Sequence, residues 1–308
     1  MADPNIINAV VDVLRGKLSQ RKAAVKHDVP RSTLRDYIRR SKVALRVNQP
    51  NEGSSLVSDP TGVYKRILVI SDQHAPYTHP DALGFLKSVK KKYRPDRVVN
   101  IGDELDYHAM SYHDADCDLD SAGVELQKGR EWLQELAVVF PQMDLVESNH
   151  GSMAYRKAKS NGVPRHLLQT YRASIFGEKD KDGEIYYPKD RGSGWVWHPS
   201  LILNTPHEPV NFHHGKKANV SSNVLDDRMC FVQGHHHSKA DISYISTPNA
   251  LLWGMTVGCL INDKSYAFAY NKIGATRPII SVGIIIDGFP RLLPIPLDTN
   301  GKWTGVTP

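Results

Sequence analysis

Side chains that commonly bind metal ions recur at the ends of predicted strands in this 308-residue chain. Asp72 and His74 follow one apolar run. Because residues i and i+2 of an extended chain point the same way, these two can bind one ion together. Sites in an open parallel α/β sheet form at the carboxyl ends of the strands. The candidate ligand segments are Asp72-Gln73-His74, GDELD at 102–106, Asn149-His150, His213-His214-Gly215 and Gly234-His235-His236-His237.

The ordered set of these segments is more specific than any one of them. A single D-x-H or a run of histidines is common by chance. Taken in order, D-x-H, G-D-x-x-D, N-H, H-G and G-H-x-H resemble the calcineurin-like metallophosphoesterase family from about Ile67 to His237. The resemblance implies a four-layer αββα sandwich with the site at one edge. It also implies two divalent metal ions, with Asp72, His74 and His237 at the first, Asn149, His214 and His235 at the second, and Asp103 bridging both.

The expected ligand types explain the expected chemistry. A bridging carboxylate neutralises two cations about 3.5–4 Å apart, and the pair polarises a phosphate and generates a hydroxide nucleophile. Mixed imidazole and carboxylate ligands favour Mn over Ca or Mg, with Fe, Zn or Ni as alternatives. By the same resemblance His150 is catalytic and binds no metal. It would contact the phosphate and protonate the leaving oxygen, which an imidazole can do near neutral pH.

The third segment departs from the family pattern, which usually has Gly-Asn-His-Asp/Glu where this chain has Ser-Asn-His-Gly at 148–151. The acidic residue that commonly orients the histidine is therefore missing. Two interpretations stay open: another group such as Asp106 replaces it, or His150 is a weaker acid. All the ligand positions are filled, which favours an active enzyme. Arg156 is a candidate phosphate clamp, with a surface or ion-pair role as the alternative.

The predicted elements place the ligand segments at one edge of a sheet. Apolar runs at 65–71, 97–101 and 143–147 are predicted strands, and stretches at 81–93 and 121–140 are predicted helices. This β-α-β-α-β order predicts an α/β core with parallel strands. After about residue 200 the pattern becomes strand-rich, with predicted strands at 200–203, 210–213, 229–232 and 279–286.

The first 48 residues hold all the excess positive charge. They contain 11 Lys and Arg against 4 Asp and Glu, a net charge of +7. The remainder contains 28 basic and 29 acidic residues, a net charge of −1. Such asymmetry indicates a segment that meets a polyanion, with a solvated basic helix as the plain alternative.

Three short helices are predicted in this basic segment, at 6–14, 20–27 and 33–40, the last two with serine N-caps. The stretch at 19–40 resembles the helix-turn-helix motif of pipsqueak and resolvase-like DNA-binding domains. Asp28 stands where glycine is usual in the turn, but aspartate tolerates left-handed backbone better than most residues. A helical protein-docking module is the alternative. The last helix would enter the major groove, with Arg31, Ser32, Thr33, Arg35, Arg39 and Arg40 contacting DNA.

These observations divide the chain into a helix-turn-helix module at 1–46, a linker rich in Pro, Gly, Ser and Asn at 47–63, and a metallophosphoesterase domain at 64–308. The favoured function is a dinuclear-metal phosphodiesterase, a nuclease brought to DNA by its basic module. Two alternatives stay open because the fold serves several activities. One is a metal-dependent phosphomonoesterase acting on a protein or a nucleotide, and the other is a DNA-binding regulator whose metal domain is structural.

Composition bears on the compartment and on partners. No apolar run approaches the roughly 18 residues of a membrane span, and the start lacks the pattern of a secretory leader. The cysteines at 117, 230 and 259 are odd in number and far apart, which favours a reducing cytoplasmic compartment. Many helix-turn-helix units act as dimers. A homo-oligomer is therefore compatible with the sequence, although no dimer surface can be identified in it.

Overall fold

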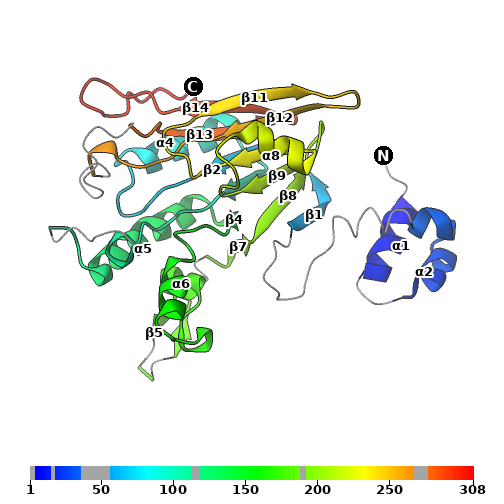
Figure 1. The fold of residues 1–308 in the computed structure, drawn as a ribbon, viewed down its shortest axis with the longest axis horizontal. Coiled ribbons are helices and arrows are strands. Elements are labelled where there is room, and N and C mark those ends of the chain that lie inside the picture. The colour runs from blue at the N-terminus through cyan, green and yellow to red at the C-terminus, as the bar shows by residue number, and fades with distance from the viewer. Residues whose placement is uncertain are drawn as a thin grey trace. The chain divides into compact units, whose positions relative to one another are not determined.

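The computed structural model describes residues 4–14, 18–35, 56–111, 118–179, 181–182, 184–187, 192–265 and 277–308. Figure 1 traces the chain, which divides into two compact units, residues 1–58 and 59–308. Within the described ranges, every helix is too short or too polar to span a lipid bilayer.

The first unit is a small helical module built on alanines. Helix α1 spans Pro4–Leu14, α2 spans Gln20–Lys26, and residues 31–35 begin a third helix. Ser19 caps α2, as predicted, because its hydroxyl accepts a hydrogen bond from the Lys22 backbone N–H at 3.4 Å. Small side chains allow helices to approach closely, and the buried core consists of Ala9, Ala23, Ala24, Val29 and Leu34.

The turn before the third helix has the expected backbone, but the helix begins earlier than predicted. Asp28 is left-handed, with a φ of 51°, so this aspartate adopts the conformation that glycine usually supplies. The Leu34 N–H donates to the Pro30 carbonyl at 2.9 Å, so Ser32 lies inside the first helical turn and is not the N-cap. The predicted helix residues 36–40 lie outside the described residues.

The second unit contains two six-stranded sheets. In spatial order the strands of the first are β14 (Phe289–Pro294), β13 (Ser281–Ile286), β2 (Arg66–Ile70), β3 (Arg97–Asn100), β4 (Gln142–Val146) and β7 (Gly194–His198). Strands β2, β3, β4 and β7 are parallel, whereas β13 is antiparallel to both β2 and β14. The parallel core predicted from the β-α-β-α-β order is therefore confirmed.

The second sheet comes mainly from the strand-rich part of the chain. In spatial order its strands are β1 (Leu56–Val63), β8 (Ser200–Asn204), β9 (Val210–His213), β10 (Cys230–Gln233), β12 (Leu251–Thr256) and β11 (Asp241–Ser246). β10 pairs in parallel with β9 and β12, while β8 is antiparallel to β9 and β11 is antiparallel to β12. β1 falls inside the segment 47–63 that is predicted as a linker. It lies at the sheet edge, the position to which proline within a strand is largely confined.

Two helices cover one face of the first sheet. Helix α4 spans Ala82–Tyr93, and α5 spans Ala122–Val139 with Ser121 as its N-cap, as predicted. Because side chains alternate along a strand, Leu68 and Ile70 of β2 point to the same face, where they share a buried cluster with apolar residues of both helices.

The other face of the first sheet packs against the second sheet. Ile67 and Val69 of β2 share a second buried cluster with apolar residues of β8, β9, β10 and β12. Helix α8 spans Val220–Asp227 and packs on the second sheet. Its Val220 side chain lies against Gly254 of β12, because a Cβ placed on that glycine would be only 2.7 Å from it. The resulting order of helix, sheet, sheet and helix is the predicted four-layer αββα sandwich.

Several short elements lie between β3 and β7 in the chain. They are the 3-10 helix η1 (His108–Met110), α6 (Met153–Ser160), the 3-10 helix η2 (Arg165–Leu167), α7 (Tyr171–Phe176), and the antiparallel pair β5 (Glu178–Lys179) and β6 (Ile185–Tyr186).

Candidate metal centre

The loops after β2 and β3 hold three of the predicted ligands in left-handed backbone. Asp72, His74 and Asp103 have φ angles of 49°, 48° and 54°. This conformation costs a non-glycine residue about 1–3 kcal/mol and persists where the surroundings enforce it. The two loops are hydrogen-bonded together, since the Asp72 N–H donates to the Gly102 carbonyl at 3.0 Å and the His74 N–H donates to the Asp103 carbonyl at 2.9 Å. The fold thus stabilises a strained arrangement that brings two carboxylates together.

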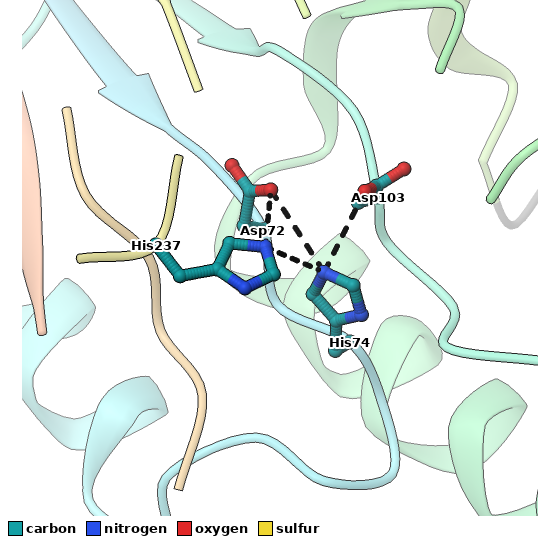
Figure 2. Close-up of side chains that lie close together, drawn as sticks. All are labelled: Asp72, His74, Asp103 and His237. Atoms are coloured by element: carbon teal, nitrogen blue, oxygen red, sulfur yellow. Dashed lines mark hydrogen bonds and ion pairs between the residues drawn. The ribbon is translucent and has the colours of Figure 1, made fainter. Parts of the chain in front are cut away.

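Four predicted ligands form one group, Asp72, His74, Asp103 and His237, whose candidate ligand atoms lie within 4.8 Å of one another. The first three are almost completely buried. Nε2 of His237 lies 3.0 Å from Oδ1 of Asp72 and 3.2 Å from Nε2 of His74. Nε2 of His74 also lies 3.5 Å from Oδ2 of Asp103. Figure 2 shows the contacts to Asp72, Asp103 and His237 meeting at this one nitrogen of His74.

Three predicted ligands form an adjacent group, Asp103, His214 and His235. Nε2 of His214 lies 3.1 Å from Oδ2 of Asp103 and 3.2 Å from Nδ1 of His235. His214 is buried, whereas His235 is exposed. The His235 backbone N–H donates to Oδ2 of Asp72 at 3.0 Å, which ties the second group to the first. Asp103 belongs to both groups.

Asn149, the remaining predicted ligand, has an unused acceptor. Its side-chain Oδ1 is buried and has no hydrogen-bond partner among the described residues. The next residue, His150, donates its backbone N–H to Oδ1 of Asp103 at 3.0 Å, so this turn lies beside the shared carboxylate. Buried polar atoms are nearly always paired. An unpaired amide oxygen here is consistent with an ion as its missing partner.

The tautomer of His214 implies a cation between it and Asp103. Nδ1 of His214 lies 2.9 Å from the Ile101 carbonyl, and because a carbonyl only accepts, Nδ1 carries the hydrogen. Nε2 of the neutral ring then presents a lone pair to the Asp103 carboxylate, so a proton or a metal ion must lie between them. Burial opposes the charged ring, but the Asp103 carboxylate overrides it and raises the pKa of His214 to about 9.

Carboxylates also favour a positive charge on the ring of His74. Its Nδ1 lies 2.5 Å from Oδ1 of Asp106, and a carboxylate behind a histidine ligand fixes the orientation of the ring. Burial disfavours the charged ring, yet hydrogen bonds to Asp106 and Asp72 raise the pKa of His74 to about 10. Burial likewise opposes ionisation of Asp72, but hydrogen bonds from His237 and His74 hold its pKa well below the ordinary value.

These observations show that the residues fit metal ions. Two nitrogens bound about 2.1 Å from one ion are roughly 3.0–3.4 Å apart at octahedral or tetrahedral angles. The nitrogen pairs His74–His237 and His214–His235 are both separated by 3.2 Å. The imidazole and carboxylate donors also match the preference of Mn, Fe and Zn.

His150 lies beside the ligand groups. Its ring meets that of His74 edge to face, with centroids 4.6 Å apart, and it shares a third cluster with His74 and Asp106. Nδ1 of His150 hydrogen-bonds the backbone carbonyl of Asp106, while the Asp106 carboxylate is 3.9 Å away. Asp106 therefore holds the ring of His150 through its carbonyl. Burial and the nearby His74 lower the pKa of His150, so a smaller fraction of the ring is protonated at a given pH.

Ser148 has a role that the sequence did not suggest. Its hydroxyl accepts hydrogen bonds from the backbone N–H groups of Asp103, at 2.9 Å, and Gly151, at 3.1 Å. It therefore joins the backbone of Asp103 to the turn that carries His150. The only sequence clue is the serine itself, which stands where the family pattern has glycine. Of the histidine runs, His213 and His236 belong to none of the ligand groups found among the described residues.

The predicted DNA-contacting residues lie at the start of the third helix of the first unit. Arg31, Ser32 and Arg35 are exposed, and Thr33 is partly buried. Arg39 and Arg40 lie outside the described residues. Arg156, the candidate phosphate clamp, is exposed and donates from Nη2 to the Asn149 carbonyl at 2.8 Å.

Known proteins resemble the two units separately. Residues 4–46 match the family described as helix-turn-helix, Psq domain, which confirms the motif predicted there. That match covers less than half of the chain. No curated protein matches the chain.

Solved structures resemble the larger part of the chain at low identity. Vacuolar Protein Sorting 29 from Cryptosporidium parvum is 15% identical, with 80% of this chain and 96% of that chain covered and a TM-score of 0.38. YfcE, a phosphoesterase from E. coli, is 12% identical, with 79% and 98% covered and a TM-score of 0.38. An archaeal phosphodiesterase is 11% identical, with 79% and 99% covered and a TM-score of 0.36. These scores are too low to assign an activity, so the function is inferred from the side chains.

Proposed function

We propose that this protein is a metal-dependent phosphodiesterase that uses two divalent metal ions to hydrolyse a nucleic-acid phosphodiester. The position of Asp103 carries the proposal, because its carboxylate belongs to both ligand groups. Two adjacent groups of imidazole and carboxylate ligands that share one carboxylate are what a two-metal hydrolase requires.

The described residues supply ligands for both ions. When bound, such ions act as Lewis acids on the phosphate and activate a water molecule. Mn is favoured, with Fe, Zn or Ni as alternatives. The first ion would be held by Asp72, His74 and His237, the second by Asn149, His214 and His235, and both by Asp103.

His150 would act on the leaving group. The Asp106 carbonyl accepts the hydrogen on Nδ1, which leaves Nε2 as the atom that can deliver a proton. The backbone hydrogen bond from His150 to Asp103 fixes the ring beside the ligand groups, with Ser148 bracing the same turn. Protonated at Nε2, His150 would donate to the departing oxygen and so remove its negative charge.

The helix-turn-helix module supports nucleic acid as the substrate. Residues 4–46 match the Psq helix-turn-helix family, and the first 48 residues carry a net charge of +7. Arg31 and Arg35 present exposed guanidinium groups at the start of the third helix. Such charge supplies sequence-independent affinity for phosphate backbones. The module would therefore bring the hydrolase to DNA.

Two synthetic esters test the proposal. The purified protein, stripped with EDTA and then supplied with Mn, should hydrolyse bis(p-nitrophenyl) phosphate faster than p-nitrophenyl phosphate and should bind two ions per chain. Faster turnover of the monoester would favour a phosphomonoesterase. Two bound ions without turnover of either ester would favour a DNA-binding regulator with a structural metal domain.

A further inference from the structure

A cavity of about 720 Å³ lies beside the ligand groups. Ser148 and Gly151 line it, while His150, between them in sequence, contacts His74 of the ligand group. The 148–152 turn thus borders both the cavity and the candidate metal centre. Small-molecule sites commonly have volumes of about 300–1,000 Å³. A substrate whose phosphate lies against His150 would therefore have a nucleoside-sized space within reach.

Aromatic rings form much of the cavity wall. Tyr107, Tyr155, Tyr171 and Trp197 all line it. Tyr171 meets Trp197 edge to face, with ring centroids 5.9 Å apart, and lies 6.4 Å from Tyr107. The guanidinium of Arg165, another lining residue, stacks over the Tyr155 ring at 5.1 Å. Aromatic faces and guanidinium planes are the groups on which proteins stack unpaired nucleobases.

Two lining residues also keep buried polar atoms without partners. Nε1 of Trp197, a donor, and Oε1 of Glu104, an acceptor, have no hydrogen-bond partner among the described residues. The other carboxylate oxygen of Glu104 accepts from the Tyr171 hydroxyl at 3.0 Å, which fixes the carboxylate. Because buried polar atoms are nearly always paired, both atoms require a ligand or water.

Gly151 keeps this space open. A Cβ at position 151 would lie 3.2 Å from Oγ of Ser148 and 3.5 Å from the Tyr171 ring. A longer side chain would therefore extend against the aromatic wall, and a carboxylate would add negative charge next to Glu104. The glycine that replaces the usual acidic residue at position 151 therefore leaves the cavity beside His150 unobstructed.

We propose that the cavity binds the nucleobase next to the scissile phosphodiester, stacked on the aromatic wall. This inference rests on the proposed function, because the base enters as part of a nucleic-acid diester. Arg156 and Arg165 line the same cavity and place positive charge where a neighbouring phosphate would lie.

Two esters with the same leaving group isolate the contribution of the base. Thymidine 5′-p-nitrophenyl phosphate and methyl p-nitrophenyl phosphate both release p-nitrophenolate, and only the first carries a nucleoside. The full chain with Mn should favour the thymidine ester at least about tenfold in kcat/KM. Tyr155→Ala and Gly151→Leu should bring this ratio close to one. Tyr244→Ala removes an exposed tyrosine outside the cavity and should leave the ratio unchanged.

Calorimetric titration with AMP and with ribose 5-phosphate gives a second readout that needs no turnover. AMP should bind the full chain about tenfold more tightly, and Tyr155→Ala should abolish the difference. Equal kcat/KM for the two esters, or equal binding of AMP and ribose 5-phosphate, would overturn the base site. If neither ester is hydrolysed while AMP still binds more tightly, the proposed hydrolysis fails and the base site stands.

Discussion

The two units of the chain handle charge in opposite ways. In the helix-turn-helix module the arginines at 31 and 35 are exposed, and the core beneath them is made of small apolar side chains. In the sandwich, Asp72 and Asp103 are buried, and imidazole rings surround them. Exposed charge retains its hydration and is available to a polyanion. Buried charge is costly unless it is paired or binds an ion. One unit is suited to meet an anion from solution, and the other to hold cations inside.

The two units also have separate cores. The alanine-rich cluster of the module shares no residue with the two large clusters of the sandwich. We therefore expect hydrolysis and DNA binding to respond to different substitutions. The predictions below test that separation, beginning with the largest effect.

Loss of the shared carboxylate should abolish hydrolysis and leave DNA binding in place. Asp103→Ala removes the one side chain that belongs to both ligand groups, so bound Mn should fall towards zero per chain and turnover of bis(p-nitrophenyl) phosphate should fall to background. Asp226→Ala removes an exposed carboxylate paired with Lys217 and serves as the control. Metal analysis, turnover and a DNA-binding titration are measured together. Unchanged Mn-stimulated turnover in Asp103→Ala would contradict the assignment of the site.

The next largest effect is expected at His150. A general acid typically contributes about 10²–10⁴-fold, so His150→Ala should lower turnover in that range. Because p-nitrophenolate needs little protonation to leave, nitrophenyl diesters should lose less activity than DNA does. Metal content should remain that of the wild type, since His150 is assigned no metal. A lost ion, or equal losses on the two kinds of substrate, would contradict the proposed role.

The sequence predicted most of the elements that carry the site, for physical reasons that differ between strands. Arg66–Ile70 (β2) was predicted because its apolar run ends abruptly at polar residues. Asp241–Ser246 (β11) was not predicted. Its alternating residues are exposed or only partly buried, and it is an edge strand defined by pairing with β12. Leu56–Val63 (β1) was missed because Pro60 and Gly62 are typical of a linker, although an edge strand tolerates both.

The candidate ligands could be predicted to lie together because ligand-type residues follow parallel strands at one edge of a sheet. What holds them could not be predicted. The Asp106 carbonyl behind His150 and the Ser148 hydroxyl under Asp103 depend on backbone angles that residue types do not specify. The cavity could not be predicted from the sequence either, because Glu104 and Trp197 are brought together only by the pairing of parallel strands β3, β4 and β7.

Removing the basic module should reverse the first result, with DNA binding weakened and hydrolysis retained. Without residues 1–48 the chain loses its entire excess of positive charge. DNA affinity at low salt should fall by roughly tenfold or more, and the slope of log K against log salt should flatten by about 0.9 for each phosphate that is no longer neutralised. Turnover of bis(p-nitrophenyl) phosphate should change little.

In the full chain, Arg31→Ala with Arg35→Ala should show a smaller decrease in DNA affinity and in its salt dependence. Equal DNA affinity of the truncated and full chains at every salt concentration would show that the module has another role.

The smallest effect concerns an ion pair that joins two helices of the module. Oδ2 of Asp12 in α1 lies 2.7 Å from Nζ of Lys26 and 2.8 Å from Nε2 of His27, at the end of α2. Hydrogen bonds to Lys26 and His27 lower the pKa of Asp12 from 3.8 to about 2. A carboxyl group whose pKa is lower in the folded state stabilises that state above its unfolded pKa. Its contribution is therefore present above about pH 4 and is lost as the pH falls towards 2.

Asp12→Asn should consequently reduce amide-exchange protection of α1 and α2 at pH 6, and the difference from the wild type should shrink as the pH falls from 4 to 2. The buried carboxylates of the sandwich should be indifferent to this substitution, so turnover of bis(p-nitrophenyl) phosphate should match the wild type. Asp28→Asn is the matched control, because it removes an exposed charge from the same module, and asparagine also tolerates the left-handed backbone. Protection factors that are equal in Asp12→Asn and the wild type at pH 6 would show that this pair does not hold the two helices together.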